Sequence, residues 1–546
     1  MEKWGKSKGF VWWKHGVIYH IYTQSFYDSN GDGVGDLQGI IQKLDYLEQL
    51  GVDAIWLSPV FVSPMFDFGY DITNYTDIDP VFGSLDDFKQ LLDKCHERGI
   101  RVILDMVLNH TSEQHPWFLE AKSSPENKYR DWYIWEEAKK GKKPNNWRSA
   151  FGGSAWEYDK NTHAYYLHTF FKQQPDLNWR NSELEKQFLD IFKFWLDMGV
   201  DGFRLDAINM IVKDKKLRNN PGIFSSFMGN KNWYTRNRPR SYKIVKRLRQ
   251  LIDSYEDRML VGEIYTFPPG DSELAGSYLK KGNDGLHMAF DFSLIFSSWK
   301  AKKYFKALDQ WYSNIPEKGW PCHVLANHDL RRIIQPFGLE STKYERARIA
   351  AMLLLTQKGT PFIYYGEEIG MQNTKLKRSQ LKDPLGKRYW PIYRGRDKTR
   401  TPMQWSNDTY GGFSSSEPWL PLNKDADYIN VKSQSQDPSS LLSFYKSIIQ
   451  LRRKYNALII GYWIPLQRGE HEIIAFYRIH KDKKLLIVLN FSNKATSRIN
   501  ITASRFKVLF STHRISGEYF ETFPLHLSPY EATIFEDLTD KIDKKN

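Results

Sequence analysis

A repeated unit in roughly the first 210 residues constrains the fold of this chain more than any other feature. Each copy has an amphipathic helix, a glycine followed by valine or isoleucine, and then an apolar strand. The copies read LDYLEQLGVDAIWLSPV, FKQLLDKCHERGIRVILDMV and FLDIFKFWLDMGVDGFRLDAI. Strands that are apolar almost throughout are typical of a parallel sheet covered on both faces by helices.

The third copy has the clearest helical spacing. Its apolar residues fall at i, i+3, i+4, i+7 and i+8, which is one face of a helix: Phe188, Ile191, Phe192, Trp195 and Leu196. Gly199 follows where the end of a helix favours a positive φ. We therefore expect a helix that ends at this glycine, with the strand directly after it.

Five further apolar segments are typical of strands and continue the series. They read GVIYHIY, MLVGEIY, GLHMAFDF, HVLANHD and PFIYYGEEIG. With the three strands of the repeated unit they make eight. Eight parallel strands with intervening helices predict an α/β fold, the (β/α)8 TIM barrel, whose active site forms at the carboxyl ends of the strands.

Two stretches break the helix and strand rhythm. The first is rich in Trp, Pro, Asn and Gly and is too long for an ordinary loop, so it predicts an inserted domain B after the third strand. The second begins after SLLSFYKSIIQLRRKY, where alternating segments such as KKLLIVLNFS predict a C-terminal antiparallel β-sandwich domain. We expect the barrel at 1–110 and 181–464, with a subdomain in its last loop at about 370–435, domain B at 111–180 and the C-terminal domain at 465–546.

Composition excludes several classes of protein. Hydrophobic residues make up 41% and charged residues 26%, which excludes collagenous and disordered chains. The two cysteines, Cys95 and Cys322, are too few for a disulfide framework. No leader-like or membrane-spanning apolar run occurs, so we expect a soluble, cytoplasmic protein without a membrane partner.

The net charge of +14 raises the question of a nucleic-acid partner. The lysines are spread along the chain, and no recognition motif accompanies them. We therefore interpret the charge as a solvated surface and expect no nucleic acid to bind.

Acidic residues occur at the ends of four predicted strands: Asp105, Asp206, Glu263 and Asp329. Arg204 and Asp206 are two residues apart in a strand, so both should point into the barrel mouth. A guanidinium favours the ionised carboxylate, which suits Asp206 to act as a nucleophile. One such carboxylate alone would equally suit a helix cap or a turn, but four at strand ends favour a catalytic site.

Two carboxyl groups of opposite protonation can break a glycosidic bond through an oxocarbenium-like transition state. The protonated partner needs a raised pKa, and Glu263 follows Val261 and Gly262 on a buried strand, which favours that role. A third carboxylate can stabilise the positive charge that develops on the sugar. The residues therefore predict a glycosidase.

Four motifs, found in order, resemble the α-amylase family, glycoside hydrolase family 13, over essentially the whole chain. They are DMVLNH, GFRLDAI, VGEI and ANHD, and QPDLNW resembles the subfamily of exo-acting α-glucosidases and oligo-1,6-glucosidases. The resemblance implies a retaining double displacement. It makes Asp206 the nucleophile, Glu263 the acid/base and Asp329 the transition-state stabiliser.

The resemblance also implies a set of substrate-binding residues. His110 and His328 would hydrogen-bond the reacting sugar, and Arg204 would orient the nucleophile. Tyr70 would be an aromatic platform, and Asp71 a ligand of the non-reducing-end glucose that pairs with Arg400. Three further residues match pocket-lining positions, with packing between domains as the alternative for the two phenylalanines: Phe151, Phe170 and Gln174.

The segment DSNGDGVGD has the spacing of a calcium loop. Side-chain oxygens stand at positions 1, 3, 5 and 9, which are Asp28, Asn30, Asp32 and Asp36. Position 7, Val34, offers its backbone carbonyl. The glutamate of position 12 is absent. Similar enzymes bind Ca²⁺ or sometimes Mg²⁺ here as a structural ion, and a plain turn is the alternative. No organic cofactor is suggested.

Ala207, directly after the nucleophile, resembles a linkage switch of this subfamily. Valine there accompanies α-1,6 preference, and alanine or threonine accompanies α-1,4. We therefore predict exo-acting release of glucose from maltose and short α-1,4-linked oligosaccharides, by a monomer or homodimer. Leu330, Arg331 and Arg332 depart from the pattern of either group, which leaves the acceptor side open.

Three alternatives follow from the same motifs. The first is an oligo-1,6-glucosidase. The second is a sucrose isomerase or transglucosylase that uses the same glycosyl-enzyme intermediate. The third, from a different class, is a catalytically silent scaffold like the heavy chains of amino-acid transporters, although those typically lose the catalytic carboxylates that this chain keeps.

Overall fold

A sheet of eight parallel strands forms the centre of the computed structural model, which describes residues 9–138, 141–221, 233–266, 270–279, 284–334, 342–496, 505–521 and 525–539. The strand order in the sheet is β11-β10-β9-β5-β2-β1-β13-β12. In chain order the strands are β1 (Ile18–Ile21), β2 (Ala54–Leu57), β5 (Arg101–Val107), β9 (Gly202–Asp206), β10 (Met259–Glu263), β11 (Met288–Phe290), β12 (Cys322–Val324) and β13 (Thr360–Tyr364).

The sheet curls into a nearly closed barrel. Its two end strands, β11 and β12, lie next to each other, and Cys322 Sγ donates to the carbonyl of Ala289 at 3.1 Å. Six of the eight segments predicted from the sequence contain one of these strands, and the other two begin one residue inside β12 and β13. The predicted (β/α)8 barrel is therefore confirmed.

Alternate strand residues face opposite sides of the barrel wall, as the period of a strand requires. One set forms a buried cluster inside the barrel, including Ile18, Trp56, Ile103, Val261 and Phe362. The neighbouring positions of the same strands pack outward against the helices in the main core. This alternation also points Asp105, two residues after Ile103, toward the barrel interior.

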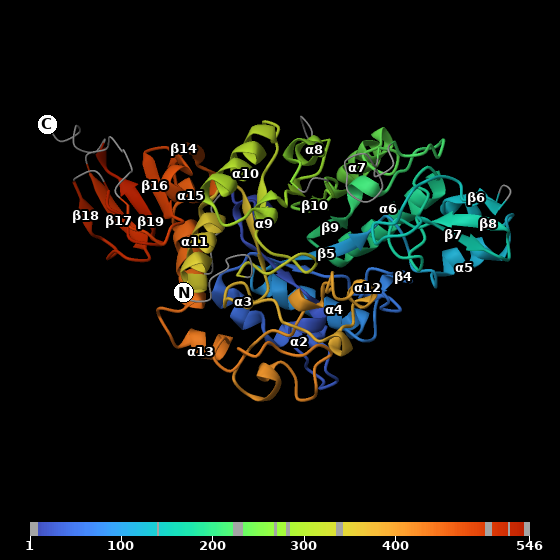
Figure 1. Ribbon diagram of the computed structural model, residues 1–546, viewed down its shortest axis with the longest axis horizontal. Coiled ribbons are helices and arrows are strands. Elements are labelled where there is room, and N and C mark those ends of the chain that lie inside the picture. The colour runs from blue at the N-terminus through green and yellow to red at the C-terminus, as the bar shows by residue number, and fades with distance from the viewer. Residues whose placement is uncertain are drawn as a thin grey trace.

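Helices follow the strands and cover the outside of the barrel (Figure 1). They are α2 (Leu37–Gln42), α3 (Leu44–Leu50), α4 (Leu85–Glu97), α6 (Ser182–Met198), α7 (Pro239–Ile252), α8 (Ser272–Ser277), α9 (Ser293–Phe296), α10 (Ala301–Asn314), α11 (Lys343–Thr356) and α14 (Leu441–Lys454). Helix α1 (Trp12–His15) instead precedes the first strand, and its Trp12 belongs to the buried cluster inside the barrel.

Helix α6 forms as its sequence predicts. Asn181 caps its first turn by accepting from the backbone N–H of Glu183 and Leu184, and Gly199 ends it at a φ of 111°. All five apolar residues of the predicted face are buried. Among the described residues, no helix has both the length and the apolar character needed to cross a membrane.

A separate small sheet follows β5, within the predicted inserted domain. Its three antiparallel strands have the order β6-β8-β7, namely β6 (Trp135–Glu137), β7 (Trp156–Asp159) and β8 (Ala164–Leu167), preceded by α5 (Pro116–Ser123). Earlier in the chain, between β2 and β5, the strands β3 (Phe61–Val62) and β4 (Asn74–Ile78) form a two-stranded sheet. Figure 1 shows the three-stranded sheet at one end of the long axis of the molecule.

A six-stranded antiparallel sheet occupies the opposite end (Figure 1). It comprises β14 (Tyr462–Arg468), β15 (Ile473–His480), β16 (Lys483–Asn490), β17 (Phe506–Ser511), β18 (Tyr519–Phe520) and β19 (Ala532–Asp537). One face packs on the barrel core near α15 (Asn456–Ile460), and the segment with Leu525 and Leu527 covers the other. Two packed faces fit the predicted β-sandwich.

The long loop after β13 carries two short helices, α12 (Pro384–Tyr389) and α13 (Val431–Ser435). The loop passes over the carboxyl end of the barrel, where Thr399 Oγ1 donates to the carbonyl of His328. The exact domain boundaries stay predictions.

Candidate active site

Arg204 on β9 joins three carboxylates at the mouth of the barrel. Its Nη1 donates to Asp105 Oδ1 at 2.6 Å and to Asp206 Oδ1 at 2.9 Å, and its Nη2 donates to Glu263 Oε2. The guanidinium is only 1% exposed. The prediction that Arg204 and Asp206 share one side of the strand is therefore confirmed, and Asp105 joins them.

A cavity of about 120 Å³ lies above these groups, and the three predicted catalytic acids Asp206, Glu263 and Asp329 all line it. It is lined as well by Asp67, Tyr70, His110, Phe151, Phe170, Ala207, Tyr265, Leu330, Leu385, Tyr393 and Arg396. A small pocket with several convergent polar groups suits a single sugar ring.

Glu263 has the environment of a general acid. Its burial raises the pKa of the carboxyl well above the usual range, and the nearby Asp206 and Asp329 raise it further while Arg204 opposes the shift. A glutamic acid that stays protonated near neutral pH can donate a proton to a leaving group. This is the property that the sequence analysis predicts for Glu263.

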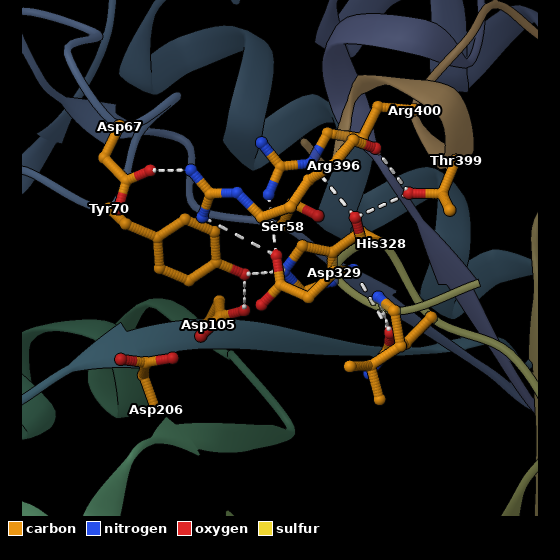
Figure 2. Close-up of polar contacts among 12 residues, drawn as sticks. Ser58, Asp67, Tyr70, Asp105, Asp206, His328, Asp329, Arg396, Thr399 and Arg400 are labelled. Carbon is orange, nitrogen blue, oxygen red and sulfur yellow. Dashed lines mark hydrogen bonds and ion pairs between the residues drawn. The ribbon is translucent and has the colours of Figure 1, made fainter. Parts of the chain in front are cut away.

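Asp329 has the opposite environment. Burial alone would raise the pKa of its carboxyl, but His328, Arg400 and Arg396 together hold the pKa below the usual range. Arg400 Nη2 lies 2.7 Å from Asp329 Oδ1, and Arg396 Nη1 lies 3.8 Å from it. Figure 2 shows both arginines extending toward this carboxylate. The same cavity thus raises the pKa of one carboxyl group and lowers that of another.

Tyr70 and His328 form one side of the site. Their rings stack with centroids 5.5 Å apart, and the Tyr70 hydroxyl lies 2.8 Å from His328 Nε2 and donates to Asp105 Oδ2 at 3.1 Å (Figure 2). Tyr70 lines the cavity as an aromatic wall, whereas His328 lies behind it. The predicted contact of His328 with the sugar stays a prediction.

The charged pair beside the cavity differs from the sequence prediction. Arg396 Nη2 donates to Asp67 Oδ1 at 2.6 Å, and both residues line the cavity. Asp71 is fully buried, and its carboxylate accepts from the backbone N–H of Phe66 and Asp67. The predicted pair of Asp71 and Arg400 is therefore wrong, because Asp71 holds a turn and Arg400 pairs with Asp329.

Gln174 also differs in part from its prediction. Its side chain does not line the cavity but supports it from behind, since Nε2 donates to Asp67 Oδ2 at 3.0 Å and lies 3.1 Å from His110 Nε2. His110 itself lines the cavity, and its Nε2 lies 3.0 Å from the carbonyl of Tyr70. Gln174 thus acts on the pocket through its neighbours.

The apolar wall is as predicted. Phe151, Phe170 and Ala207 line the cavity, and Phe170 and Ala207 pack together with Met210. Phe151 and Phe170 also pack on each other within the inserted domain, with ring centroids 5.3 Å apart, and Phe170 alone of the two shares a cluster with the barrel residues Ala207 and Met210 as a buried member. Ala207 has a φ of 40°, in the left-handed region that few residues with a side chain adopt.

The loop predicted to bind calcium is tightly turned. Gly31 and Gly33 have positive φ, and Asp28 accepts from the backbone N–H of Gly31 and Gly33. Asp36 instead caps α2 through the N–H of Gly39. Across the described residues, no three His, Cys, Asp or Glu side chains gather closely enough to hold a metal ion.

The donor set of the loop nevertheless fits a hard cation in kind. It offers the side-chain oxygens of Asp28, Asn30 and Asp32 and the carbonyl of Val34, and oxygen-only ligands are what Ca²⁺ prefers. The metal site therefore stays a prediction.

Several residues of the cavity were not predicted from the sequence. Asp67 and Arg396 each stand four positions before the residue chosen from the sequence, just ahead of the motifs FGYD and RTPMQW. Tyr265 follows Glu263 by two residues, which the alternation of β10 could have indicated. Leu385 and Tyr393 come from the loop after β13, where no pattern marks them.

Comparison with known proteins agrees with this geometry. The family described as "Alpha amylase, catalytic domain" matches residues 20–461, and "Alpha-amylase SusG C-terminal domain" matches residues 473–534. The chain is 39% identical to an oligo-1,6-glucosidase of Parageobacillus thermoglucosidasius, covering 96% of this chain and 99% of that relative. It is 40% identical to a probable alpha-glucosidase of Rhizobium meliloti strain 1021, covering 89% and 90%.

A solved structure resembles the whole chain. The crystal structure of an alpha-glucosyl transfer enzyme superposes with a TM-score of 0.90 at 37% sequence identity, and covers 97% of this chain and 100% of its own. The resemblance inferred from the four motifs is therefore confirmed along nearly the full length.

Proposed function

Because this chain belongs to the α-amylase family of glycoside hydrolases, we propose that it is a retaining α-glucosidase that releases glucose from the non-reducing ends of maltose and short α-1,4-linked oligosaccharides. The observation that carries this proposal is that Arg204 contacts both Asp206 and Glu263 at a cavity that Asp329 also lines. Two carboxyl groups that share one guanidinium are close enough to act on one glycosidic bond.

Each acid has a role that its surroundings support. Asp206 attacks the anomeric carbon and forms a glycosyl-enzyme ester, while Glu263 gives its proton to the departing oxygen. Water then attacks the ester, Glu263 takes a proton from that water, and Asp206 is released. Asp329, kept ionised by Arg400 and Arg396, stabilises the positive charge on the sugar in both steps.

The Asp67 and Arg396 pair supports exo action. It lies at one end of the cavity and presents a charge-assisted pair to the hydroxyls of a terminal sugar ring. Phe151 also lines the cavity and packs against Arg396, with the guanidinium 5.5 Å from the ring centroid. A continuing polysaccharide chain would have no exit there.

Glucosyl transfer is the second candidate, and the structural similarity to an alpha-glucosyl transfer enzyme favours it. Hydrolysis and transfer share the glycosyl-enzyme and differ in whether water or a sugar attacks it. An α-1,6 preference is favoured by the oligo-1,6-glucosidase relative. We place hydrolysis of α-1,4 bonds first because Ala207 is small, which widens the acceptor side of the cavity.

We further propose that the loop 28–36 binds Ca²⁺ as a structural ion through Asp28, Asn30, Asp32 and the carbonyl of Val34. The ion would tie this loop to the barrel and supply no chemistry to the reaction. We also propose a cytoplasmic location, supported by Cys95 and Cys322, both buried and neither in a disulfide.

Product analysis tests the proposed reaction. The purified enzyme is incubated with maltose, isomaltose and sucrose, and the sugars are separated over time. We expect free glucose to form fastest from maltose. Trisaccharides as main products would establish transfer instead of hydrolysis. An isomeric disaccharide from sucrose would establish isomerisation. A clear preference for isomaltose would overturn the α-1,4 assignment.

The nucleophile assignment has its own test. The Asp206→Asn variant should fold normally, because asparagine has the same shape and can still accept from Arg204, yet lose at least about 10³-fold in kcat. A folded variant with near wild-type turnover would contradict the role of Asp206 and, with it, the proposed mechanism.

A further inference from the structure

A buried lysine lies just outside the active-site cavity, in the segment after β9. Lys213 is 3% exposed, and its ammonium donates to Asn109 Oδ1 at 2.7 Å and to the carbonyl of Met210, and pairs with Asp176 Oδ2 at 3.0 Å. All three of its N–H groups thus have an acceptor, as burial of a charge requires. Lys213 does not line the cavity, and nothing in the proposed mechanism uses it.

The lysine is two contacts away from His110, which does line the cavity. The Nε2 atom of His110 has two neighbours, and each favours a different protonation state of that nitrogen. It lies 3.0 Å from the carbonyl of Tyr70, which requires an N–H on Nε2, and 3.1 Å from the amide nitrogen of Gln174, which favours a lone pair there. The tautomer is left open on this side of the ring.

The other side of the ring settles the tautomer, because Asn109 can have only one orientation. An ammonium only donates, so the Asn109 atom that faces Lys213 must be the oxygen. The Asp176 carboxylate only accepts, so the Asn109 atom 2.9 Å from Asp176 Oδ1 must be the NH₂ nitrogen. The two neighbours demand the same orientation independently.

The second hydrogen of the Asn109 amide then faces His110 Nδ1 at 3.2 Å, so Nδ1 must accept. We propose that Lys213 is a positioning residue that fixes the Asn109 amide and, through it, holds His110 as the neutral tautomer with its proton on Nε2. That proton lies on the side of the ring next to Tyr70 and Gln174, where the carbonyl of Tyr70 accepts it.

The same contacts join two parts of the chain. Asp176 belongs to the QPDLNW segment of the inserted domain, where it also accepts from the backbone N–H of Thr169. His110 and Asp176 form an isolated antiparallel bridge. Docking of the inserted domain on the barrel therefore brings Asp176 to Lys213 and Asn109, and the His110 tautomer is set only in the assembled molecule.

Burial lowers the pKa of His110, as it does for a ring that must stay neutral, while Asp206, Asp176 and Asp67 oppose the shift. The hydrogen bond from Asn109 acts in the same direction as burial, because a proton on Nδ1 would face the hydrogens of the amide. The role of His110 as donor to a sugar hydroxyl rests on the proposed function, whereas its tautomer does not.

Nuclear magnetic resonance of the intact enzyme, labelled with ¹⁵N in its histidine rings, tests the tautomer directly. The His110 signal is assigned as the one lost in His110→Gln. At pH 7 we expect an Nδ1 shift typical of a bare nitrogen and an Nε2 shift typical of a protonated one. The opposite tautomer, or a doubly protonated ring, would overturn the proposal whatever the enzyme hydrolyses.

Lys213→Met tests whether the lysine controls the tautomer, with Lys215→Met as matched control because Lys215 is exposed in the same segment. Without the ammonium only Asp176 still orients the Asn109 amide, and its carboxylate has lost the cation that pairs with it, so we expect a mixture of His110 tautomers and a loss of at least about tenfold in kcat/KM. Lys215→Met should change neither. An unchanged His110 spectrum in folded Lys213→Met would refute the positioning role, even if activity fell.

Discussion

Arg400 donates from Nη2 to Asp329 Oδ1 over 2.7 Å, while its Nε donates to the carbonyl of His328 (Figure 2). The fully buried guanidinium is therefore held in place by the backbone next to the carboxylate that it neutralises. Because arginine stays charged at all relevant pH, this contact keeps Asp329 ionised down to acidic pH. An ionised Asp329 is what a developing oxocarbenium ion needs beside it.

Arg400→Met removes that charge and keeps most of the side-chain volume. The pKa of Asp329 should then rise, so activity should fall away at a higher pH on the acidic side of the profile. We also expect kcat to drop by about 10² at neutral pH. A profile of kcat/KM from pH 4 to 8 measures both effects, with the exposed Arg388→Met as control. An acid limb that stays in place would contradict this role.

Glu263→Gln should separate stability from activity. Burial raises the folded pKa of Glu263 above its usual 4.5, so the stability from its neutral form is full below that pH and is lost as pH rises. Glutamine is neutral throughout, so the variant should gain thermal stability over wild type progressively above pH 4.5. Its kcat on maltose should fall by about 10² to 10⁴.

The leaving group provides the control for the Glu263 variant. A substrate such as p-nitrophenyl α-glucoside needs little protonation of its leaving oxygen, so its cleavage step should suffer far less than that of maltose. Equal losses on both substrates would rule out Glu263 as the general acid.

Asp67→Asn and Asp71→Asn form a matched pair. Asp67 pairs with Arg396 beside the cavity, so its variant should lose about 10² in kcat/KM with a modest loss of stability. Asp71 accepts two backbone N–H groups and one hydroxyl away from the cavity, so its variant should lose about 1–3 kcal/mol of unfolding free energy and keep its KM. Steady-state kinetics and thermal unfolding of both variants test these two expectations. If Asp71→Asn lost activity and Asp67→Asn lost mainly stability, Asp71 would again be the sugar ligand.

The barrel and its catalytic strand were predictable because the helical and strand periods of apolar residues are visible in the sequence. Helical spacing predicted α6 and its end at Gly199, and strand alternation predicted that Arg204 and Asp206 point the same way. Both periods are properties of local backbone geometry, so they appear in the sequence without knowledge of the rest of the fold.

The choice between Asp67 and Asp71, or between Arg396 and Arg400, was not predictable in the same way. Asp67 and Asp71 lie in a turn, and Arg396 and Arg400 lie at the two ends of a single 3-10 turn at 397–399. Neither stretch is long enough for a period in the sequence to assign a side. Contacts from distant segments decide instead, since Gln174 holds Asp67 and Asp383 holds Arg396. Such contacts exist only after the inserted domain and the loop after β13 have folded over the barrel.

Calcium should stabilise the chain without changing its chemistry. If the loop 28–36 binds Ca²⁺, millimolar CaCl₂ should raise the unfolding temperature by a few degrees and a chelator should reverse the rise, because a ligand that binds only the folded state stabilises it. Asp32→Asn, an exposed position, should abolish the response, and Asp408→Asn nearby should not. A wild-type melting curve indifferent to Ca²⁺, Mg²⁺ and chelator would establish the plain turn.

Ala207→Val should shift the preference from maltose toward isomaltose. Two added methyl groups would enter the wall formed with Phe170 and Met210 and narrow the cavity next to the nucleophile. The branched side chain would also strain a backbone at φ 40°, at a cost of about 1–3 kcal/mol. Ala207→Gly relieves that backbone and removes volume, so it serves as the control. We expect the isomaltose to maltose ratio of kcat/KM to rise at least about tenfold in Ala207→Val and to stay or fall in Ala207→Gly. A rise in both variants would assign the effect to backbone movement, and no rise in Ala207→Val would end the case for Ala207 as the linkage switch.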